Sequence, residues 1–310
     1  MGKEKIFRTL DEQVDIFREK GLVINNVERA KEILFRENYF FISGYRHIFM
    51  KSAKERQFLP GTTFEELYAF FTFDRAVRNV LFKNILVIEN NLKSIFSYHL
   101  SKKYGFREKD YLKESNFIND YKRHRQVSDV LRKMKRQIAK NGAQHAATSH
   151  YISKYGYIPF WVVVKVLSFG IISELYSILK IEDQLAIAEY YDLDVDNFSI
   201  FLPILSNYRN LCAHEDIVYD QRTQREILDN KYHQKLNIPT MNDEYVYGKN
   251  DLFAVIIILK YLLRDEEFRG VVYEIDYEIA LLDGKVDVIP TNKILNRMGF
   301  PNNWRDIIDL

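Results

Sequence analysis

The chain is poor in the residues that interrupt regular structure. Its 310 residues include only 6 Pro and 12 Gly, whereas Phe (22) and Tyr (21) are abundant. Because Pro and Gly punctuate turns, their scarcity argues against a turn-rich β sandwich and favours long uninterrupted helices. The composition therefore predicts a mostly α-helical protein, long enough to bury a sizeable core.

Cysteine is almost absent as well. The single Cys212 excludes an intramolecular disulfide and a zinc site built from several thiolates. The N-terminal stretch MGKEKIFRTLDEQVDIF contains no apolar core of signal-peptide length. Both features favour a cytoplasmic protein.

Long hydrophobic runs are missing too. The most apolar stretches, IPFWVVVKVLSFGII (158–172) and LFAVIIILKYLL (252–263), are shorter than the ~20 residues that span a bilayer. Lys165 also stands in the middle of the first. We therefore expect two core helices and no membrane partner.

Charge is nearly balanced overall, at +2, but it is unevenly placed. Residues 121–140 hold eight Lys/Arg and one Asp, whereas residues 215–310 hold eighteen Asp/Glu and twelve Lys/Arg. This segregation indicates that a polyanion would meet one part of the molecule and be excluded from another.

Helical periodicity and capping residues outline the elements. A helix is predicted before Gly21, a second from about Val27, and a stretch of over 40 residues that starts after Thr62 or Thr63 and ends at Gly105, as one helix or two. A buried helix is predicted from Pro159 to Lys180. Another is expected after an N-cap at Asp196 or Asn197, and Pro203 would kink it or mark its first turn.

These elements predict three regions. Residues 1–60 form an N-terminal helical region, residues 61–270 a helical domain with a basic insertion at about 106–157, and residues 271–310 a C-terminal tail packed on the domain. The insertion is polar, and its apolar periodicity is weak.

Two carboxylates stand out on the long predicted helix. Asp74 falls on its apolar face, among positions such as Leu67, Val77 and Leu81, and Glu89 lies beside the continuation of that face. Because an unpaired buried charge is costly, Asp74 needs a partner.

The stretch SNYRNLCAHEDIVYD (206–220) carries the candidate chemistry. On an ideal helix Asn210 and His214 share a face, whereas Arg209 and His214 lie roughly 140° apart, so a long arginine must reach around or the helix must loosen. A histidine suits proton transfer near neutral pH, and a guanidinium suits a phosphorane with extra negative charge. The pair fits RNA cleavage in which a base takes the 2′-OH proton. An R-x-x-x-x-H pattern alone also arises by chance.

Common catalytic signatures are missing from the sequence. There is no H-E-x-x-H, no paired Cys and no Asp cluster with metal-ligand spacing, so neither a metal nor another cofactor is predicted. A G-x-S-x-G elbow, a P-loop and a G-x-G-x-x-G turn are missing as well.

The segment YRNLCAH resembles the R-N-x-x-x-H signature of the HEPN superfamily of helical ribonucleases. Its surroundings resemble the Abi-like family of bacterial abortive-infection proteins, AbiD/AbiF type. The blocks that carry the resemblance follow the family's order over nearly the whole chain, and they are LDEQVDIFREKGLVI, NYFFISGYRHIF, FDRAVRNVLFKNILVIENNLKSIFSYHLSKKYG, PFWVVVKVLSFGIISELYSIL, RNLCAH and GFPNNW. The chain departs from the pattern at Glu215, where many relatives have a second His, at Lys93, where Arg is common, and at Lys165, where Glu is common.

The resemblance implies a HEPN-type helical bundle and a ribonuclease of phage defence. It assigns the reaction to Arg209 and His214, with Asn210 as polar companion, and it makes Glu89 an orienter of Arg209 and Asp74 a supporting residue. Because the chain has one motif, it implies a homodimer with a shared cleft. It further implies metal-independent cleavage to a 2′,3′-cyclic phosphate and control by a small non-coding RNA.

The basic segment 121–140 can be interpreted in two ways. It either contacts RNA phosphates, with Tyr121 and His124 available for stacking on bases, or forms a solvated helix face. Its candidate RNA-binding residues are Lys122, Arg123, Arg125, Arg132, Lys133, Lys135 and Arg136. The alternative to a nuclease is a non-catalytic helical module that binds RNA or a protein.

Overall fold

The computed structural model describes residues 6–52, 54–142 and 144–310. Within these residues the chain is mostly helical and has almost no strands, which confirms the mostly α class. The described strands, β1 (Thr240–Met241) and β2 (Glu244–Tyr245), form one short antiparallel hairpin. Among the same residues, no helix combines the length and the apolar character needed to cross a bilayer.

The α-helices are α1 (Leu10–Glu19), α2 (Val27–Glu37), α3 (Tyr39–Gly44), α4 (Phe64–Tyr104), α5 (Glu108–Tyr111), α6 (His124–Gly142), α7 (Ala146–Tyr155), α8 (Phe160–Val163), α9 (Phe169–Ile178), α10 (Ile181–Ala188), α11 (Val195–Ala213), α12 (Lys231–Lys235), α13 (Leu252–Leu262), α14 (Asp265–Asp283) and α15 (Thr291–Arg297). Short 3-10 helices join them: η1 (Tyr45–Phe49), η2 (Glu114–Asn116), η3 (Tyr121–Arg123), η4 (Glu189–Tyr191) and η5 (Trp304–Asp309).

Helix α4 is the axis of the molecule. It is one helix of 41 residues, roughly 60 Å long, capped by Thr63 in a capping box with Glu66 and closed by Gly105 at a φ of 95°. The sequence therefore located both ends correctly. Apolar residues that line one side of the helix, from Leu67 to Leu100, are buried.

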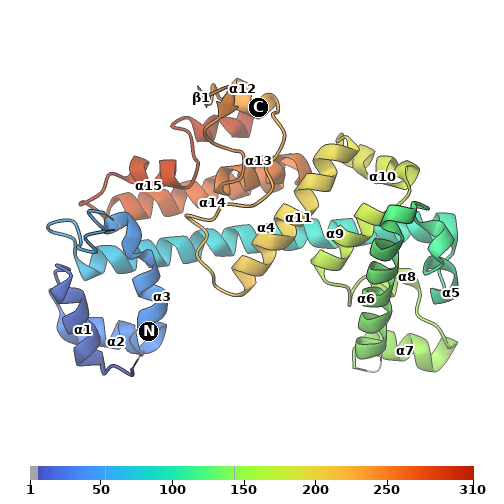
Figure 1. Ribbon diagram of the computed structural model, residues 1–310, viewed down its shortest axis with the longest axis horizontal. Helices are drawn as coiled ribbons and strands as arrows, with labels where there is room; N and C mark the ends of the chain where they lie inside the picture. Colours follow the sequence, from blue (N-terminus) through green and yellow to red (C-terminus); the bar gives the residue numbers. More distant parts are fainter. Residues whose placement is uncertain (1–5, 53, 143) are drawn as a thin grey trace.

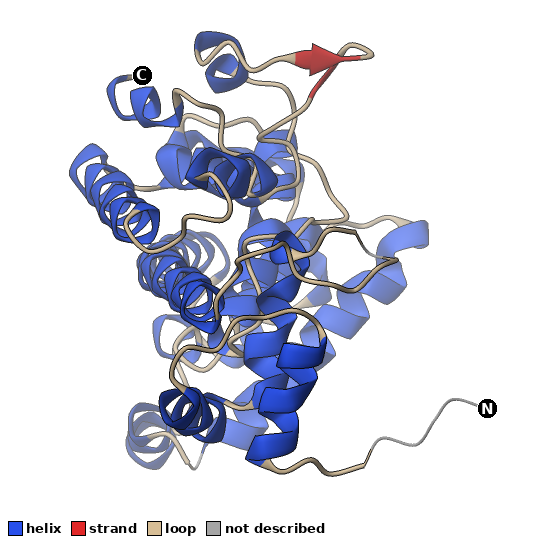
Figure 2. Cartoon of the chain, turned by 90° about the vertical axis from the view of Figure 1, so that its left-hand side faces the viewer, coloured by secondary structure: helices blue, strands red, loops and turns tan. Residues whose placement is uncertain are grey.

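Other helices pack along this axis and at its two ends (Figure 1). Helices α1–α3 lie at one end and α5–α8 at the other, while α14 runs beside α4 and α11 crosses it. Figure 2 looks along the same axis from the N-terminal end. The predicted boundary at residue 270 falls inside α14.

Two local expectations were wrong. The apolar run from Pro159 to Lys180 forms two helices, because α8 ends at Val163 and the Ser168 side chain caps α9. Helix α11 is capped by Asp194 rather than by Asp196 or Asn197. Pro203 lies in the interior of α11, so it does not mark the first turn, and a kink at this residue stays a prediction.

The basic insertion has a clearer apolar face than its composition indicated. In α6, Val127, Val130, Leu131 and Met134 recur at helical spacing, are buried and pack toward α9. The basic segment is therefore one face of an amphipathic helix that is held on the body of the protein.

Candidate functional site

The motif lies where α11 ends. The helix remains regular to Ala213, His214 is the C-cap, and Glu215 adopts the left-handed conformation with a φ of 57°. The Glu215 N–H donates to the Cys212 carbonyl at 3.3 Å and the Asp216 N–H to the Leu211 carbonyl at 3.0 Å, which is a Schellman motif. This closure fixes the direction in which the chain leaves His214.

The polar motif residues lie on the accessible side of α11. Tyr208 and Cys212 are buried, whereas Asn210 and His214 are exposed. Among the described residues, the His214 imidazole and the Asn210 amide have no hydrogen-bond partner. Both side chains are therefore available to a ligand.

Arg209 is held by an ion pair with α4. Its Nε donates to Glu89 Oε2 at 3.4 Å, and its guanidinium carbon lies 5.7 Å from the Phe82 ring centroid. The Glu89 side chain is 5% exposed and also accepts from Lys93 Nζ at 2.7 Å. Two cations thus share one buried carboxylate, which leaves the cluster with a net positive charge.

Helix α11 is not loosened at the motif, so it does not bring Arg209 toward His214. Because the helix is regular between them, the two side chains leave it roughly 140° apart, and Arg209 turns to α4. The terminal nitrogens of Arg209 have no partner among the described residues, and its side chain is 33% exposed. The guanidinium is therefore anchored at one nitrogen and open to an anion at the others.

Asp74 has the partners that its buried position required. It accepts from the Tyr45 hydroxyl at 2.6 Å, from Arg78 Nη1 at 2.7 Å and from the Tyr219 N–H at 2.8 Å. Burial raises the pKa of Asp74, and the hydrogen bond from Tyr45 and the charge of Arg78 oppose that rise. The same environment raises the pKa of Tyr45, chiefly through burial.

This buried network holds residues 215–219, the connector that follows the motif. Arg78 Nη1 also donates to the Asp216 carbonyl at 3.3 Å, and the Val218 N–H donates to Asp74 at 3.3 Å. Tyr45 and Arg78 were not identified from the sequence as site-supporting residues. The four-residue spacing of Asp74 and Arg78 on a helix was the one available signal for Arg78.

The basic face of α6 lies at the other end of the molecule from α1–α3 (Figure 1). Arg123 is half-buried and donates to the Ser177 carbonyl, and Lys133 pairs with Glu174 at 2.5 Å. Arg132 pairs with Asp129. The remaining candidates are exposed and have no side-chain partner among the described residues, and they are Lys122, Arg125, Lys135 and Arg136.

Within the described residues, no three or more His, Cys, Asp or Glu side chains are grouped so as to hold a metal ion. Lys165 is exposed, and Lys93 is the second cation that contacts Glu89. The departure at Lys93 therefore keeps a positive charge beside Arg209.

Neither a curated protein nor a solved structure matches the chain. The profile of the family described as Abi-like protein matches residues 32–220. This span includes Asp74, Glu89 and the whole motif from Arg209 to His214, and it ends just after the connector. HEPN membership and the AbiD/AbiF subtype stay predictions. Because the match covers more than half of the sequence, the chain belongs to the family of Abi-like proteins.

Proposed function

We propose that this protein is an antiphage abortive-infection endoribonuclease of the HEPN type. The observation that carries the proposal is His214, which is exposed and has no side-chain partner in the described part of the chain. It lies at the end of the same helix that presents Arg209, and Arg209 is anchored on Glu89. The imidazole serves as the general base or acid, and the guanidinium neutralises the charge that develops on the phosphorus. Attack by the 2′-OH yields a 2′,3′-cyclic phosphate and a 5′-OH.

A homodimer completes the site in this proposal. The angle between Arg209 and His214 on a regular helix favours a cleft to which two copies each bring one pair. The exposure of Asn210 and His214 leaves the end of α11 accessible to a second copy. Mass measurement in solution tests this step separately, because a monomer that cleaves RNA would contradict it.

The exposed cations of η3 and α6 extend the proposal to substrate or regulatory RNA. Lys122, Arg125, Lys135 and Arg136 are exposed, and in this proposal they neutralise phosphates. A small non-coding RNA that controls activity is part of the same proposal, as is a cytoplasmic location. In this proposal α6 binds the RNA strand, and the motif at the end of α11 cleaves it.

The proposal is tested with labelled single-stranded RNA in EDTA. We expect cleavage by the wild type, loss of at least a hundredfold in His214→Ala and Arg209→Ala, and no cleavage of RNA with 2′-deoxyribose at the scissile position. His145→Ala and Arg29→Ala remove exposed residues of the same types outside the motif and serve as controls. Products without a cyclic phosphate would contradict the mechanism.

Cells provide a second test in case a trigger is required. Bacteria that express the wild type should arrest when challenged with phage, whereas cells that express His214→Ala should not. RNA binding without cleavage in either setting supports the alternative, a non-catalytic helical module for RNA or protein. The Glu89–Arg209 ion pair favours that alternative in one respect, because an arginine that only pins two helices makes the same contact.

A further inference from the structure

A cavity of about 800 Å³ borders the motif. From the motif and its connector it takes Leu211, Glu215, Asp216 and Ile217. Its other wall comes from α3 and η1, which approach the connector so closely that a Cβ on Gly44 would lie 2.9 Å from Ile217. The volume is in the range of small-ligand sites.

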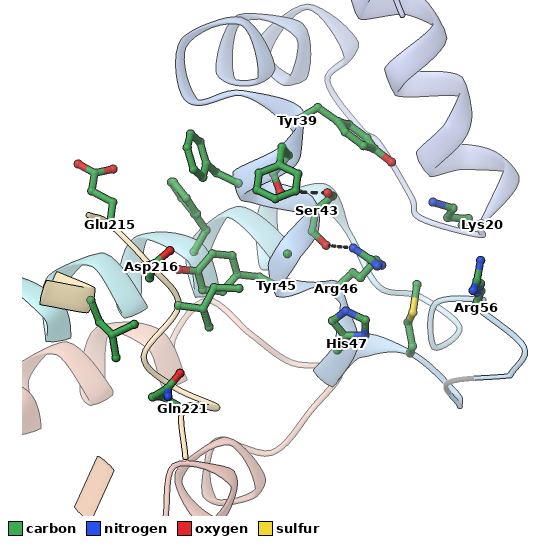
Figure 3. Close-up of a pocket in the computed structure, with 17 residues that line it drawn as sticks. Lys20, Tyr39, Ser43, Tyr45, Arg46, His47, Arg56, Glu215, Asp216 and Gln221 are labelled. Carbon is green, nitrogen blue, oxygen red and sulfur yellow. Dashed lines mark hydrogen bonds between the residues drawn. The ribbon is translucent and has the colours of Figure 1, made fainter. Parts of the chain in front are cut away.

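Basic and acidic side chains lie on opposite sides of the cavity. Figure 3 shows Arg46, His47 and Arg56 on one side and Glu215 and Asp216 on the opposite side. Arg56 is exposed and its guanidinium has no partner among the described residues, while Arg46 donates to the Ser43 carbonyl at 2.5 Å. A ligand that fits must be anionic at one end and a hydrogen-bond donor at the other.

Aromatic rings also line the cavity. Phe40 is 76% exposed and Phe41 46% exposed, although both are large apolar side chains, and their ring centroids lie 5.8 Å apart. Phe35 on α2 is exposed as well but does not line this cavity. Exposed aromatic faces beside cations are the arrangement by which proteins bind unstacked bases.

We infer that this cavity binds one unpaired nucleotide of an RNA strand, with the base against Phe40 and Phe41 and the phosphate at Arg46 and Arg56. The carboxylates on the far side accept hydrogen bonds, so Glu215 selects bases that carry an exocyclic amino group. It disfavours uracil, because the N3–H of uracil stands between two carbonyl oxygens that a carboxylate repels. RNA as the source of the nucleotide rests on the proposed function. In this inference Glu215, which stands where many relatives have a second His, determines the base specificity.

Binding is measured separately from cleavage, on the full chain with His214→Ala, by fluorescence anisotropy of eight-nucleotide oligo(C) and oligo(U). We expect oligo(C) to bind at least fivefold more tightly. Phe40→Ala with Phe41→Ala should weaken oligo(C) binding roughly tenfold, since each stacked base contributes about that much. Glu215→Ala should remove the preference for oligo(C), and Arg56→Ala should weaken both oligomers.

Phe35→Ala and Arg29→Ala are the matched controls, because they remove an exposed aromatic and an exposed arginine that do not line the cavity. The inference is overturned if the cavity variants bind both oligomers as the parent does. It is also overturned if CMP binds and no oligonucleotide displaces it, or if Phe40 and Phe41 affect only self-association. If oligonucleotides bind as expected but the wild-type chain never cleaves RNA, the proposed function is wrong and this inference still holds.

Discussion

Arg209 of α11 donates to Glu89 of α4 across 3.4 Å, at a carboxylate that Lys93 also contacts at 2.7 Å. The carboxylate is buried, so water does not replace either partner easily. A change at Glu89 therefore acts on the position of Arg209 as well as on local stability.

Glu89→Gln should slow RNA cleavage about tenfold or more, because a neutral amide cannot form an ion pair with the guanidinium. Lys93→Gln is the matched variant, since it removes the other ion pair and leaves Arg209 anchored. We expect near wild-type cleavage in that variant. Cleavage rates and thermal unfolding of both proteins check the prediction, and an equal loss of rate in the two would contradict it.

Asp74→Asn should destabilise the protein by about 3 kcal/mol, because it leaves Arg78 buried without a counter-charge. The amide hydrogens of Val218 and Tyr219 should also exchange faster, since both bond to this carboxylate. Denaturant unfolding and hydrogen exchange measure the two effects. Asp15→Asn, on an exposed face of α1, is the control, and unchanged exchange at the connector would refute the anchoring role.

The sequence was most informative where a signal is local. Thr63 and Gly105 marked the ends of α4 because capping depends on a few adjacent residues. Asp74 could be identified as needing a partner, but Tyr45 and the Tyr219 N–H are 29 and 145 residues away, and their identity depends on tertiary packing.

Other features depended on contacts that composition does not show. The run from Pro159 to Lys180 is apolar throughout, so its break between α8 and α9 was hidden, although Ser168 is a recognisable N-cap. The cavity beside the motif joins Phe40 and Arg46 to Glu215, which no periodicity connects. The motif residues were identified from the sequence, and the family resemblance implied that Glu89 orients Arg209. The contacts of Lys93 with Glu89 and of Phe82 with Arg209 became known only from the fold.

Under the proposed function, the exposed Lys135 and Arg136 of α6 contact phosphates rather than bases. Lys135→Ala with Arg136→Ala should therefore weaken RNA binding without changing sequence preference. The slope of log affinity against log salt should decrease by about 0.7 for each phosphate of a single strand that is no longer neutralised. Lys235→Ala, an exposed cation in the acidic part of the chain, is the control. An unchanged salt slope would contradict RNA binding by α6.

Asp251 should make stability depend on pH. Burial raises its pKa from 3.8 to about 6, and it caps α13 while Gly299 packs so closely that a Cβ there would lie 2.1 Å away. Between the unfolded pKa of 3.8 and the folded pKa of about 6, Asp251 keeps a proton in the folded state that the unfolded chain releases. The carboxyl group of Asp251 therefore contributes less stability as pH rises from 4 to 6.

Asp251→Asn removes that titration. Relative to the variant, the wild type should lose about 2 kcal/mol of unfolding free energy between pH 4 and pH 7. Parallel denaturant curves of the two proteins across this range give the difference directly. Curves that stay a constant distance apart would show that Asp251 ionises normally in the fold.

Because α4 is unbroken, it fixes the spacing of the side chains along it. Asp74 near one end, Glu89 in the middle and Lys103, paired with Asp183, near the other are spaced by the fixed rise of a helix, about 1.5 Å for each residue. A single inserted residue between Asp74 and Glu89 would rotate one half of this rod by about 100° relative to the other. Glu89 and Asp74 would then no longer contact Arg209 and the connector at the same time.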